Sequence, residues 1–208
     1  MPIEMITGPM FSGKSEELIR RIRRAIIAGQ KVQVFTPALD FRGGENCIYS
    51  HDKRTIDAIP INKSREILEN LEPDTEVIGI DEIQFLDEKI IDVALELASR
   101  GMRVILACLN LDFRGEPFPF RDSKRTVADM IALSDHVDKL HAICTYKLKD
   151  ENGAKRICGK EAYFTQRLID GKPAPYNSPI IVVGSEELYE ARCREHHIVP
   201  GKPKKTLC

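Results

Sequence analysis

The sequence predicts an α/β fold in which a mostly parallel sheet has helices on both faces, followed by a small second domain. The order and the length of the segments predict the sheet. Short apolar segments alternate with longer amphipathic segments over residues 1–143, and the amphipathic segments are long enough to cross between parallel strands. The chain has 208 residues, of which 42% are hydrophobic, so it can bury a core of its own.

Strands are expected where short apolar runs occur, at residues 3–7, 31–36, 76–81, 102–108 and 137–143. Helices are expected where apolar residues recur every three or four positions, at residues 15–28, 86–99 and 127–133. Gly29 and Gly101 follow the first two helices, and glycine is the residue most typical just after a helix. Four or five strands therefore fit within residues 1–143.

The composition changes after Cys144. Charged and turn-forming residues follow at 149–153, and three prolines lie between residues 172 and 179. We therefore expect residues 1–143 to form the main α/β domain and residues 144–197 to form a small, loop-rich domain. Residues 198–208 are basic and contain two prolines, so we expect a flexible tail.

The charge is nearly balanced, with 31 Lys and Arg residues against 32 Asp and Glu residues. This balance argues against a protein whose main task is to bind a nucleic-acid backbone. No run approaches 18 apolar residues, so no membrane-spanning helix is expected. The N-terminus has no pattern of a signal peptide, so we expect a cytoplasmic protein whose six cysteines are buried or bind metal rather than form disulfides.

Residues 8–15 read GPMFSGKS and match the phosphate-binding pattern G-x-x-x-x-G-K-[ST] between an expected strand and an expected helix. In such a loop, backbone N–H groups surround a phosphate and the helix N-terminus adds positive potential. Lys14 would reach the β- and γ-phosphates, and Ser15 offers a hydroxyl group to Mg²⁺. The alternative is an ordinary glycine-rich turn. The loop in this context predicts a P-loop (RecA-like) nucleotide-binding domain at residues 1–143.

The expected strand at 76–81 ends in two carboxylates, Asp81 and Glu82. Nucleotides bind beyond the carboxyl ends of such strands, so Asp81 is expected to face the metal. Glu82, one residue further on, is a candidate general base. It would accept a proton from a substrate hydroxyl group if the protein is a small-molecule kinase, or from water if it is an ATPase or GTPase. Charge balance and length favour the kinase. For the two acids alone, a solvated strand end is the alternative.

Four segments in this order resemble the type II class of thymidine kinases, at residues 8–15, 81–85, 111–118 and 165–171. The resemblance covers about residues 3–197. It implies transfer of the ATP γ-phosphate to the 5′-hydroxyl of thymidine, giving dTMP for DNA synthesis by nucleotide salvage. It also implies Mg²⁺ and structural Zn²⁺ as cofactors, a homotetramer and feedback inhibition by dTTP. The alternative function is a P-loop ATPase acting on DNA.

In the resembled class, Glu82 matches the proton acceptor, and Ser15 and Asp81 would hold Mg²⁺. The positions that match the ATP site are Gly8, Pro9, Met10, Phe11, Ser12, Gly13, Lys14, Ser15, Asp81, Glu82, Ile83 and Gln84. Candidates to pack around the thymine ring, each with ordinary core packing as the alternative, are Met10, Phe85, Phe113 and Phe118. The class has a lasso over the nucleoside, and its matching positions are Val182, Val183, Gly184, Ser185 and Tyr189.

Three further charged groups have two interpretations each. Asp52 would assist the metal and Arg54 would contact phosphate, or both belong to a solvated loop. Arg167 would place a phosphate or form a structural ion pair. Four arginines at positions 20, 21, 23 and 24 suggest nucleic acid, but a solvated or subunit-facing helix surface is favoured because the total charge is balanced.

A tetrahedral Zn²⁺ site is expected at Cys144, Cys158, Cys193 and His196, with His197 as the alternative to His196. Two residues separate Cys193 from His196, a common ligand spacing. The class has a structural zinc here that holds the base of the lasso. Its first two cysteines are usually close together, whereas thirteen residues separate them in this chain, so a hairpin is needed to bring the thiols together.

The alternative to this zinc site is two buried thiols and an exposed Cys–His pair without metal. The remaining cysteines are expected to be non-ligands, namely Cys47, Cys108 and Cys208.

Overall fold

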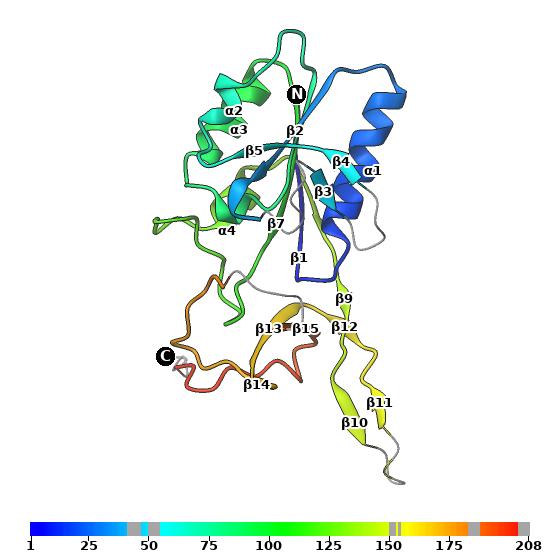
Figure 1. Ribbon diagram of the computed structural model, residues 1–208, viewed down its shortest axis with the longest axis vertical. Coiled ribbons are helices and arrows are strands. Elements are labelled where there is room, and N and C mark those ends of the chain that lie inside the picture. The colour runs from blue at the N-terminus through cyan, green and yellow to red at the C-terminus, as the bar shows by residue number, and fades with distance from the viewer. Residues whose placement is uncertain (41–46, 50–54, 150–152, 154, 183–187, 204–208) are drawn as a thin grey trace. The chain divides into compact units, whose positions relative to one another are not determined.

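Figure 1 shows the computed structural model of the chain, which describes residues 1–40, 47–49, 55–149, 153, 155–182 and 188–203. The chain divides into two compact units. Unit 1 comprises Met1–Thr7, Gly13–Asn110 and Pro117–Leu140. Unit 2 comprises Gly8–Ser12, Leu111–Glu116 and His141–Cys208. Among the residues described, no helix is long and apolar enough to cross a membrane.

Unit 1 is built on a six-stranded parallel sheet with the order β5-β2-β6-β7-β1-β8. Its strands, in chain order, are β1 (Ile3–Gly8), β2 (Val32–Pro37), β5 (Ile59–Ile61), β6 (Val77–Ile80), β7 (Arg103–Leu109) and β8 (His136–Lys139). Every residue of β1 and β6 is buried. Continuous apolar runs of this kind are what a parallel sheet covered on both faces requires.

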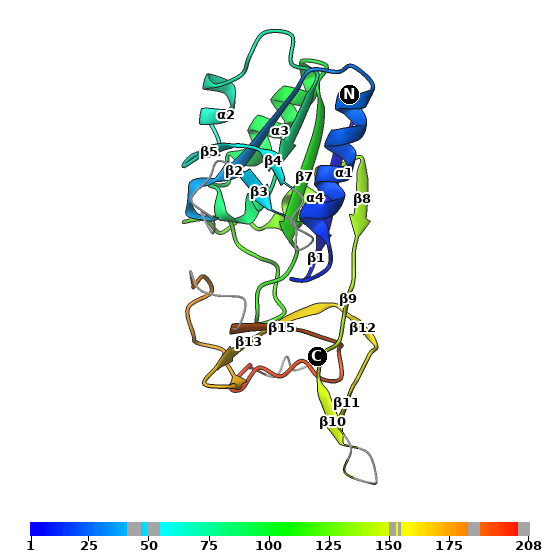
Figure 2. The ribbon, with the colours of Figure 1, turned by 45° about the vertical axis from the view of Figure 1, so that its right-hand side comes forward.

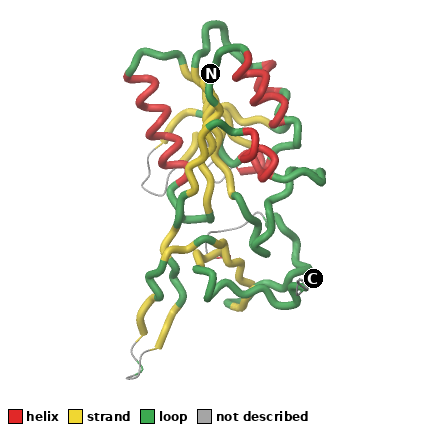
Figure 3. Tube along the Cα trace, turned by 180° about the vertical axis from the view of Figure 1, so that it is seen from behind, coloured by secondary structure: helices red, strands yellow, loops and turns green. Residues whose placement is uncertain are grey.

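Helices cover both faces of this sheet, with α1 (Lys14–Ile27) on one face and the others on the opposite face (Figures 1 and 3). The helices opposite α1 are α2 (Glu66–Glu69), α3 (Ile90–Ser99) and α4 (Val127–Leu133). The buried side of α1 carries Leu18, Ile19 and Ile22 at helical spacing, so the apolar periodicity of this segment comes from packing on the sheet. Unit 1 is completed by the short helices η1 (Ala38–Asp40) and η2 (Ile83–Phe85) and the hairpin of β3 (Cys47–Tyr49) and β4 (Thr55–Asp57).

Most of the expected elements are confirmed, and two need correction. The helix expected at 86–99 begins at Ile90, because the carboxylate of Asp87 accepts hydrogen bonds from the N–H groups of Lys89 and Ser64 and precedes the first helical turn. The strand expected at 137–143 is wrong as one element. It is divided into β8, which pairs with β1, and β9 (Ala142–Ile143), which joins another sheet. Apolar content does not reveal where a chain changes sheets.

Unit 2 consists of small antiparallel sheets. β13 (Phe164–Ile169) lies between β14 (Lys172–Pro173) and β15 (Tyr189–Arg192), and β9 pairs with β12 (Glu161–Ala162). Figure 2 shows the hairpin of β10 (Lys147–Lys149) and β11 (Lys155–Ile157) continuing from β9 and β12. A buried cluster of unit 2 contains three alanines and two cysteines, so apolar burial alone gives this part little stability.

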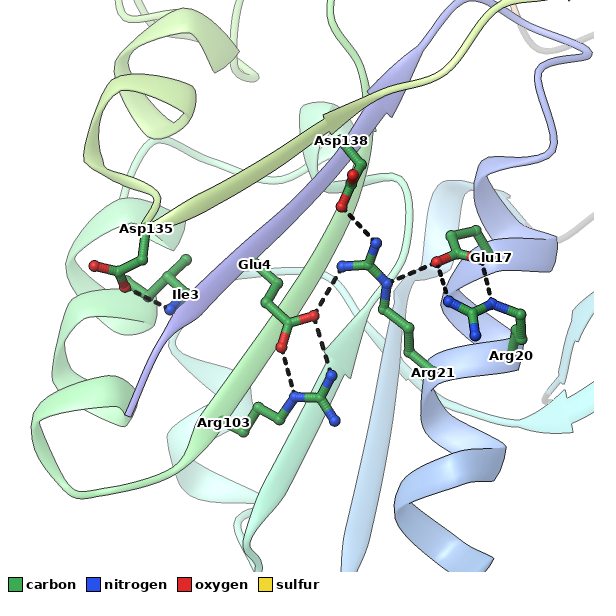
Figure 4. Close-up of polar contacts among 8 residues, drawn as sticks. All are labelled: Ile3, Glu4, Glu17, Arg20, Arg21, Arg103, Asp135 and Asp138. Atoms are coloured by element: carbon green, nitrogen blue, oxygen red, sulfur yellow. Dashed lines mark hydrogen bonds and ion pairs between the residues drawn. The ribbon is translucent and has the colours of Figure 1, made fainter.

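A network of ion pairs in unit 1 joins β1, α1, β7 and β8 (Figure 4). Glu4, which is 8% exposed, accepts hydrogen bonds from Arg21 at 2.8 Å and from Arg103 at 2.6 Å. Arg21 also contacts Glu17 at 2.9 Å and Asp138 at 2.6 Å. Part of the arginine-rich surface of α1 therefore forms ion pairs within unit 1.

The network lowers the pKa values of its glutamates. A hydrogen bond from Arg20 is the main reason that the pKa of Glu17 falls to about 2. Burial acts to raise the pKa of Glu4, but hydrogen bonds and charge from Arg103 and Arg21 outweigh burial and lower it. Because both carboxyl groups are more acidic when folded, the stabilisation is present above pH 4.5 and is lost as the pH falls towards about 2.

Replacing Glu4 by Gln should lower the free energy of unfolding at pH 7 by about 2 kcal/mol, because it leaves two partly buried guanidinium groups without their carboxylate. Urea denaturation measures the loss, which should shrink as the pH is lowered through the acidic range. Glu96→Gln is the matched control. It removes the exposed pair with Arg100 and should cost less than about 0.5 kcal/mol. Equal losses in the two variants would contradict the role of Glu4.

Candidate active site and metal centre

The glycine-rich loop connects β1 to α1. Within unit 2, the hydroxyl group of Ser12 donates to the carbonyl of Pro9 at 2.8 Å, and Phe11 has a left-handed backbone with φ 65°. Within unit 1, Gly13 has φ 81° just before Lys14 begins α1. Glycine adopts this conformation readily, whereas a phenylalanine there is strained. Such strained backbone is typical of ligand-binding loops.

The carboxyl ends of β1 and β6 bring Ser15 and Asp81 together, as expected. One strand, β7, lies between them in the sheet. The hydroxyl group of Ser15 is hydrogen-bonded to the carboxyl group of Asp81, which is only 3% exposed. The side chain of Lys14, also buried, contributes positive charge at this carboxyl group.

Burial and the nearby charge of Glu82 raise the pKa of Asp81 to about 7, although the hydrogen bond from Ser15 and the charge of Lys14 act in the opposite direction. A hydroxyl and a carboxylate oxygen are hard ligands of the kind that Mg²⁺ prefers. A divalent cation at these oxygens would favour the ionised form of Asp81. The donor set at this edge of the sheet therefore fits Mg²⁺.

Glu82 follows Asp81 in a strained, left-handed conformation with φ 47°. Its backbone N–H group donates to the Asp81 carboxylate at 3.0 Å. The side-chain amide of Gln84 donates to Oε2 of Glu82 and accepts the N–H group of Leu109 at 3.1 Å. Gln84 is fully buried, and so is Ile83, the first residue of η2. The side chain of Gln84 thus connects the carboxylate of Glu82 to β7.

Two of the four candidates for contact with thymine meet in unit 1. Phe85 and Phe118 pack edge to face, with ring centroids 6.0 Å apart. Phe118 is almost fully buried, whereas Phe85 is half-buried. Asn110 directly follows the last residue of β7, and its buried side-chain Oδ1 has no hydrogen-bond partner among the described residues. Asn110 is not among the residues predicted from the sequence, although its position as a polar residue just after a buried strand is the signal that identified Asp81.

Met10 and Phe113, the other two candidates, belong to unit 2. The N–H group of Met10 donates to the hydroxyl of Thr165 at 3.0 Å, and Phe113 is buried beneath the guanidinium of Arg167, 5.7 Å from the ring centroid. Arg167 donates through Nη1 to the carbonyl of Pro179, and its buried Nε has no hydrogen-bond partner within the described ranges. Neither the expected phosphate contact nor the expected ion pair of Arg167 is established by these contacts.

Val182 and Tyr189 of the expected lasso are both half-buried. The rest of the lasso candidates lie outside the described residues, as do two of the charged candidates in the earlier loop. These residues are Val183, Gly184, Ser185, Asp52 and Arg54.

The four expected zinc ligands come together in unit 2. The thiol sulfurs of Cys144, Cys158 and Cys193 and a ring nitrogen of His196 all lie within 4.8 Å of one another. The Nδ1 atom of His196 is 3.2 Å from the sulfur of Cys193 and 3.7 Å from that of Cys144. A tetrahedral zinc site has ligand–ligand distances of about 3.5–3.8 Å. The cluster is therefore a Cys₃His site that fits Zn²⁺.

Local backbone contacts explain how the thirteen-residue insertion is accommodated. The insertion forms the β10–β11 hairpin, which brings Cys158 back beside Cys144. The N–H group of Cys158 donates to the carbonyl of Tyr146 at 2.8 Å, and that of Gly159 donates to the carbonyl of Cys144 at 3.1 Å. The ring of Tyr146 stacks on His196 with centroids 4.2 Å apart. The hairpin expected from the spacing is confirmed.

The remaining candidates do not join the cluster. Nε2 of His197 lies 2.8 Å from the carbonyl oxygen of Phe113, so the structure favours His196 over His197 as the ligand. Burial lowers the pKa of His197. Burial also raises the pKa of Cys108 to about 12, so Cys108 is an unreactive thiol. The side chains of Cys47 and Cys208 lie outside the described residues.

Purified protein should contain about one zinc ion per chain, and Cys158→Ser should lose it, because a hydroxyl group replaces a thiolate ligand. Metal analysis after dialysis measures the loss. Cys108→Ser is the matched control and should keep its zinc. A parent chain that takes up no zinc, or a Cys158→Ser chain that keeps a full equivalent, would contradict the metal centre.

Comparison with known protein families adds an independent finding. The family model described as thymidine kinase matches residues 1–197. The match includes the glycine-rich loop, the carboxylates after β6 and all four residues of the Cys₃His cluster. The chain therefore belongs to the thymidine kinase family and is an ATP-dependent phosphotransferase.

Proposed function

We propose that this protein transfers the γ-phosphate of ATP to the 5′-hydroxyl of thymidine, giving dTMP in nucleotide salvage for DNA synthesis. Family membership supports thymidine phosphorylation in general. The observation that carries the proposal is the carboxylate of Glu82, held by Gln84 next to the Ser15–Asp81 pair. This arrangement supports Glu82 as a base beside a site suited to Mg²⁺ and phosphate.

On the nucleotide side, we assign ATP binding to the backbone of residues 8–13, to Lys14 and to the segment 81–84. Lys14 supplies positive charge to the phosphates, and the start of α1 adds the field of a helix N-terminus. Ser15 and Asp81 would hold Mg²⁺. When bound, Mg²⁺ neutralises charge on the phosphate oxygens of ATP.

Glu82 acts as the general base in this proposal. It accepts the proton of the thymidine 5′-hydroxyl as that oxygen bonds to the γ-phosphorus and the bond from the γ-phosphorus to the ADP oxygen breaks. The hydrogen bond from Gln84 occupies Oε2 of Glu82 and fixes the side chain. A base held in one orientation needs little rearrangement at the moment of reaction.

On the nucleoside side, we assign the thymine ring to Met10, Phe85, Phe113 and Phe118. Aromatic faces suit a flat base. The unpartnered Oδ1 of Asn110 is an acceptor suited to a donor group of the nucleoside. We assign the lid to Val182, Val183, Gly184, Ser185 and Tyr189, where it would exclude water from the γ-phosphate and so limit ATP hydrolysis.

Other properties proposed for this chain rest on its family. We propose a cytoplasmic homotetramer that is inhibited by dTTP. The inhibitor combines the thymine of one substrate with the triphosphate of the other, so a single molecule offers groups for both parts of the site. The Cys₃His site would have a structural role, because a bound zinc ion would hold together the parts of unit 2 that carry its four ligands.

Glu82→Gln should lower kcat for thymidine phosphorylation by a factor of about 10² to 10⁴, because the amide cannot accept the proton. ATP binding, followed with a fluorescent nucleotide, should change little. Asp92→Asn on the exposed face of α3 is the matched control and should keep full activity. Unchanged turnover in Glu82→Gln would refute its assignment as the base.

A panel of nucleosides incubated with Mg-ATP tests the substrate directly. Thymidine should give the most monophosphate product, with the other nucleosides giving less, because the apolar site and the lid select a thymine nucleoside. ATP hydrolysis that DNA stimulates and thymidine does not affect would instead support an ATPase acting on DNA. Chromatographic separation of nucleotide products gives the readout.

A further inference from the structure

The loop at Leu111–Glu116 of unit 2 carries Phe113 and has a fixed internal conformation. Asp112 is buried, and its carboxylate accepts hydrogen bonds from the N–H groups of Arg114 at 2.8 Å and Glu116 at 3.2 Å. The N–H group of Asp112 donates to the carbonyl of Glu116 at 2.8 Å. The loop is thus a closed turn with Phe113 near its tip.

The side chain of His197, which lies outside the loop, contacts the backbone of Phe113. The Nε2 atom of His197 lies 2.8 Å from its carbonyl oxygen. A carbonyl only accepts, so the imidazole of His197 carries a hydrogen on Nε2 and donates it. The same ring stacks on Phe164 with centroids 4.5 Å apart and planes 9° apart, which fixes its orientation.

Gly115 makes this close approach possible. Its backbone is left-handed, with φ +72°, and a Cβ atom added there would lie 3.2 Å from Cε1 of His197 and 3.3 Å from the ring of Phe164. Any other residue would be strained and would press on both rings. The loop and the imidazole therefore fit each other closely.

The backbone of His197 is tied to the metal cluster. The carbonyl of Cys193 accepts the N–H groups of both His196 and His197, at 3.2 Å and 3.0 Å, so the two histidines share one turn. The next residue, Ile198, is held on both sides by Gln166, which accepts its N–H group at 2.9 Å and donates to its carbonyl at 3.0 Å. Ligation at Cys193 and His196 would fix the position of the neighbouring imidazole.

We propose that His197 is a positioning residue that couples metal binding at the Cys₃His site to the affinity for thymidine, by fixing the loop that carries Phe113. The part that concerns thymidine rests on the function proposed above. Because His197 acts on the loop that carries Phe113, a candidate for contact with thymine, the coupling is expected in nucleoside binding rather than in the chemical step.

Two substitutions separate the hydrogen bond from the ring stacking. His197→Phe keeps a flat ring against Phe164 but removes the donor. It should raise KM for thymidine about fivefold, since one hydrogen bond is lost, with kcat and KM for ATP within about twofold of the parent. His197→Gln keeps an N–H donor and should recover most of the affinity. The zinc content of both variants should match that of the parent.

A control and a second readout separate this coupling from a general structural effect. His141→Phe alters another imidazole of unit 2, one that packs on Tyr163, and should leave KM unchanged. Hydrogen exchange at residues 111–116 reports on the loop without any assay of activity. Chelation of zinc should speed this exchange in the parent. In His197→Phe the exchange should already be fast, and chelation should add little.

The two readouts fail in distinguishable ways. If the parent phosphorylates no nucleoside, the proposed function falls, while hydrogen exchange still tests the coupling between metal and loop. A His197→Phe chain with parental KM and parental exchange overturns the coupling, and so does chelation that speeds exchange equally in both proteins. If His197→Phe loses zinc, hydrogen exchange at residues 111–116 in His197→Gln becomes the test of the donor role. Parental exchange in its zinc-loaded form supports the donor role, and exchange as fast as in the chelated parent overturns it.

Discussion

Parallel strands bring their carboxyl ends to one edge of a sheet, and the candidate active site in unit 1 depends on that constraint. β1 leads to Ser15, β6 ends at Asp81, and β7 lies between the two strands. The hydrogen bond between Ser15 and Asp81 is the direct product of this geometry. The ion pairs of Glu4 join β1 to α1 and β7, so they support the same elements from within the unit.

The polar groups at this edge are held by side chains that are themselves buried. Gln84 connects Glu82 to β7, and the strained backbone of Glu82 persists because both of its neighbours are fixed. Unit 2 has far less apolar material in the cluster around its cysteines, and a zinc ion at the Cys₃His site would supply the rigidity that those small side chains lack. Apolar burial gives order to unit 1, and metal ligation is proposed to do so around the cysteines of unit 2.

Much of this arrangement could be predicted from the sequence, because its signals are local. The glycine-rich loop, the carboxylates after β6 and the spacing of the cysteines each identify a chemical group within a few residues. The division of residues 137–143 between β8 and β9, the short strand β5 and the contact of His197 with Phe113 depend on partners far along the chain. His197 shows the limit most clearly, since it is adjacent to a ligand in sequence but directed to Phe113 in the structure. The roles of the site residues in binding and catalysis remain predictions.

The central claim is that one sheet edge binds the triphosphate while Glu82 takes the proton of the acceptor hydroxyl. A crystal structure with a non-hydrolysable ATP analogue and thymidine tests it most directly. The account predicts phosphates on the loop at residues 8–15 and the thymidine 5′-oxygen about 2.6–3.2 Å from the carboxylate of Glu82. A 5′-oxygen that contacts a different base, or phosphates bound away from Lys14 and Ser15, would contradict it.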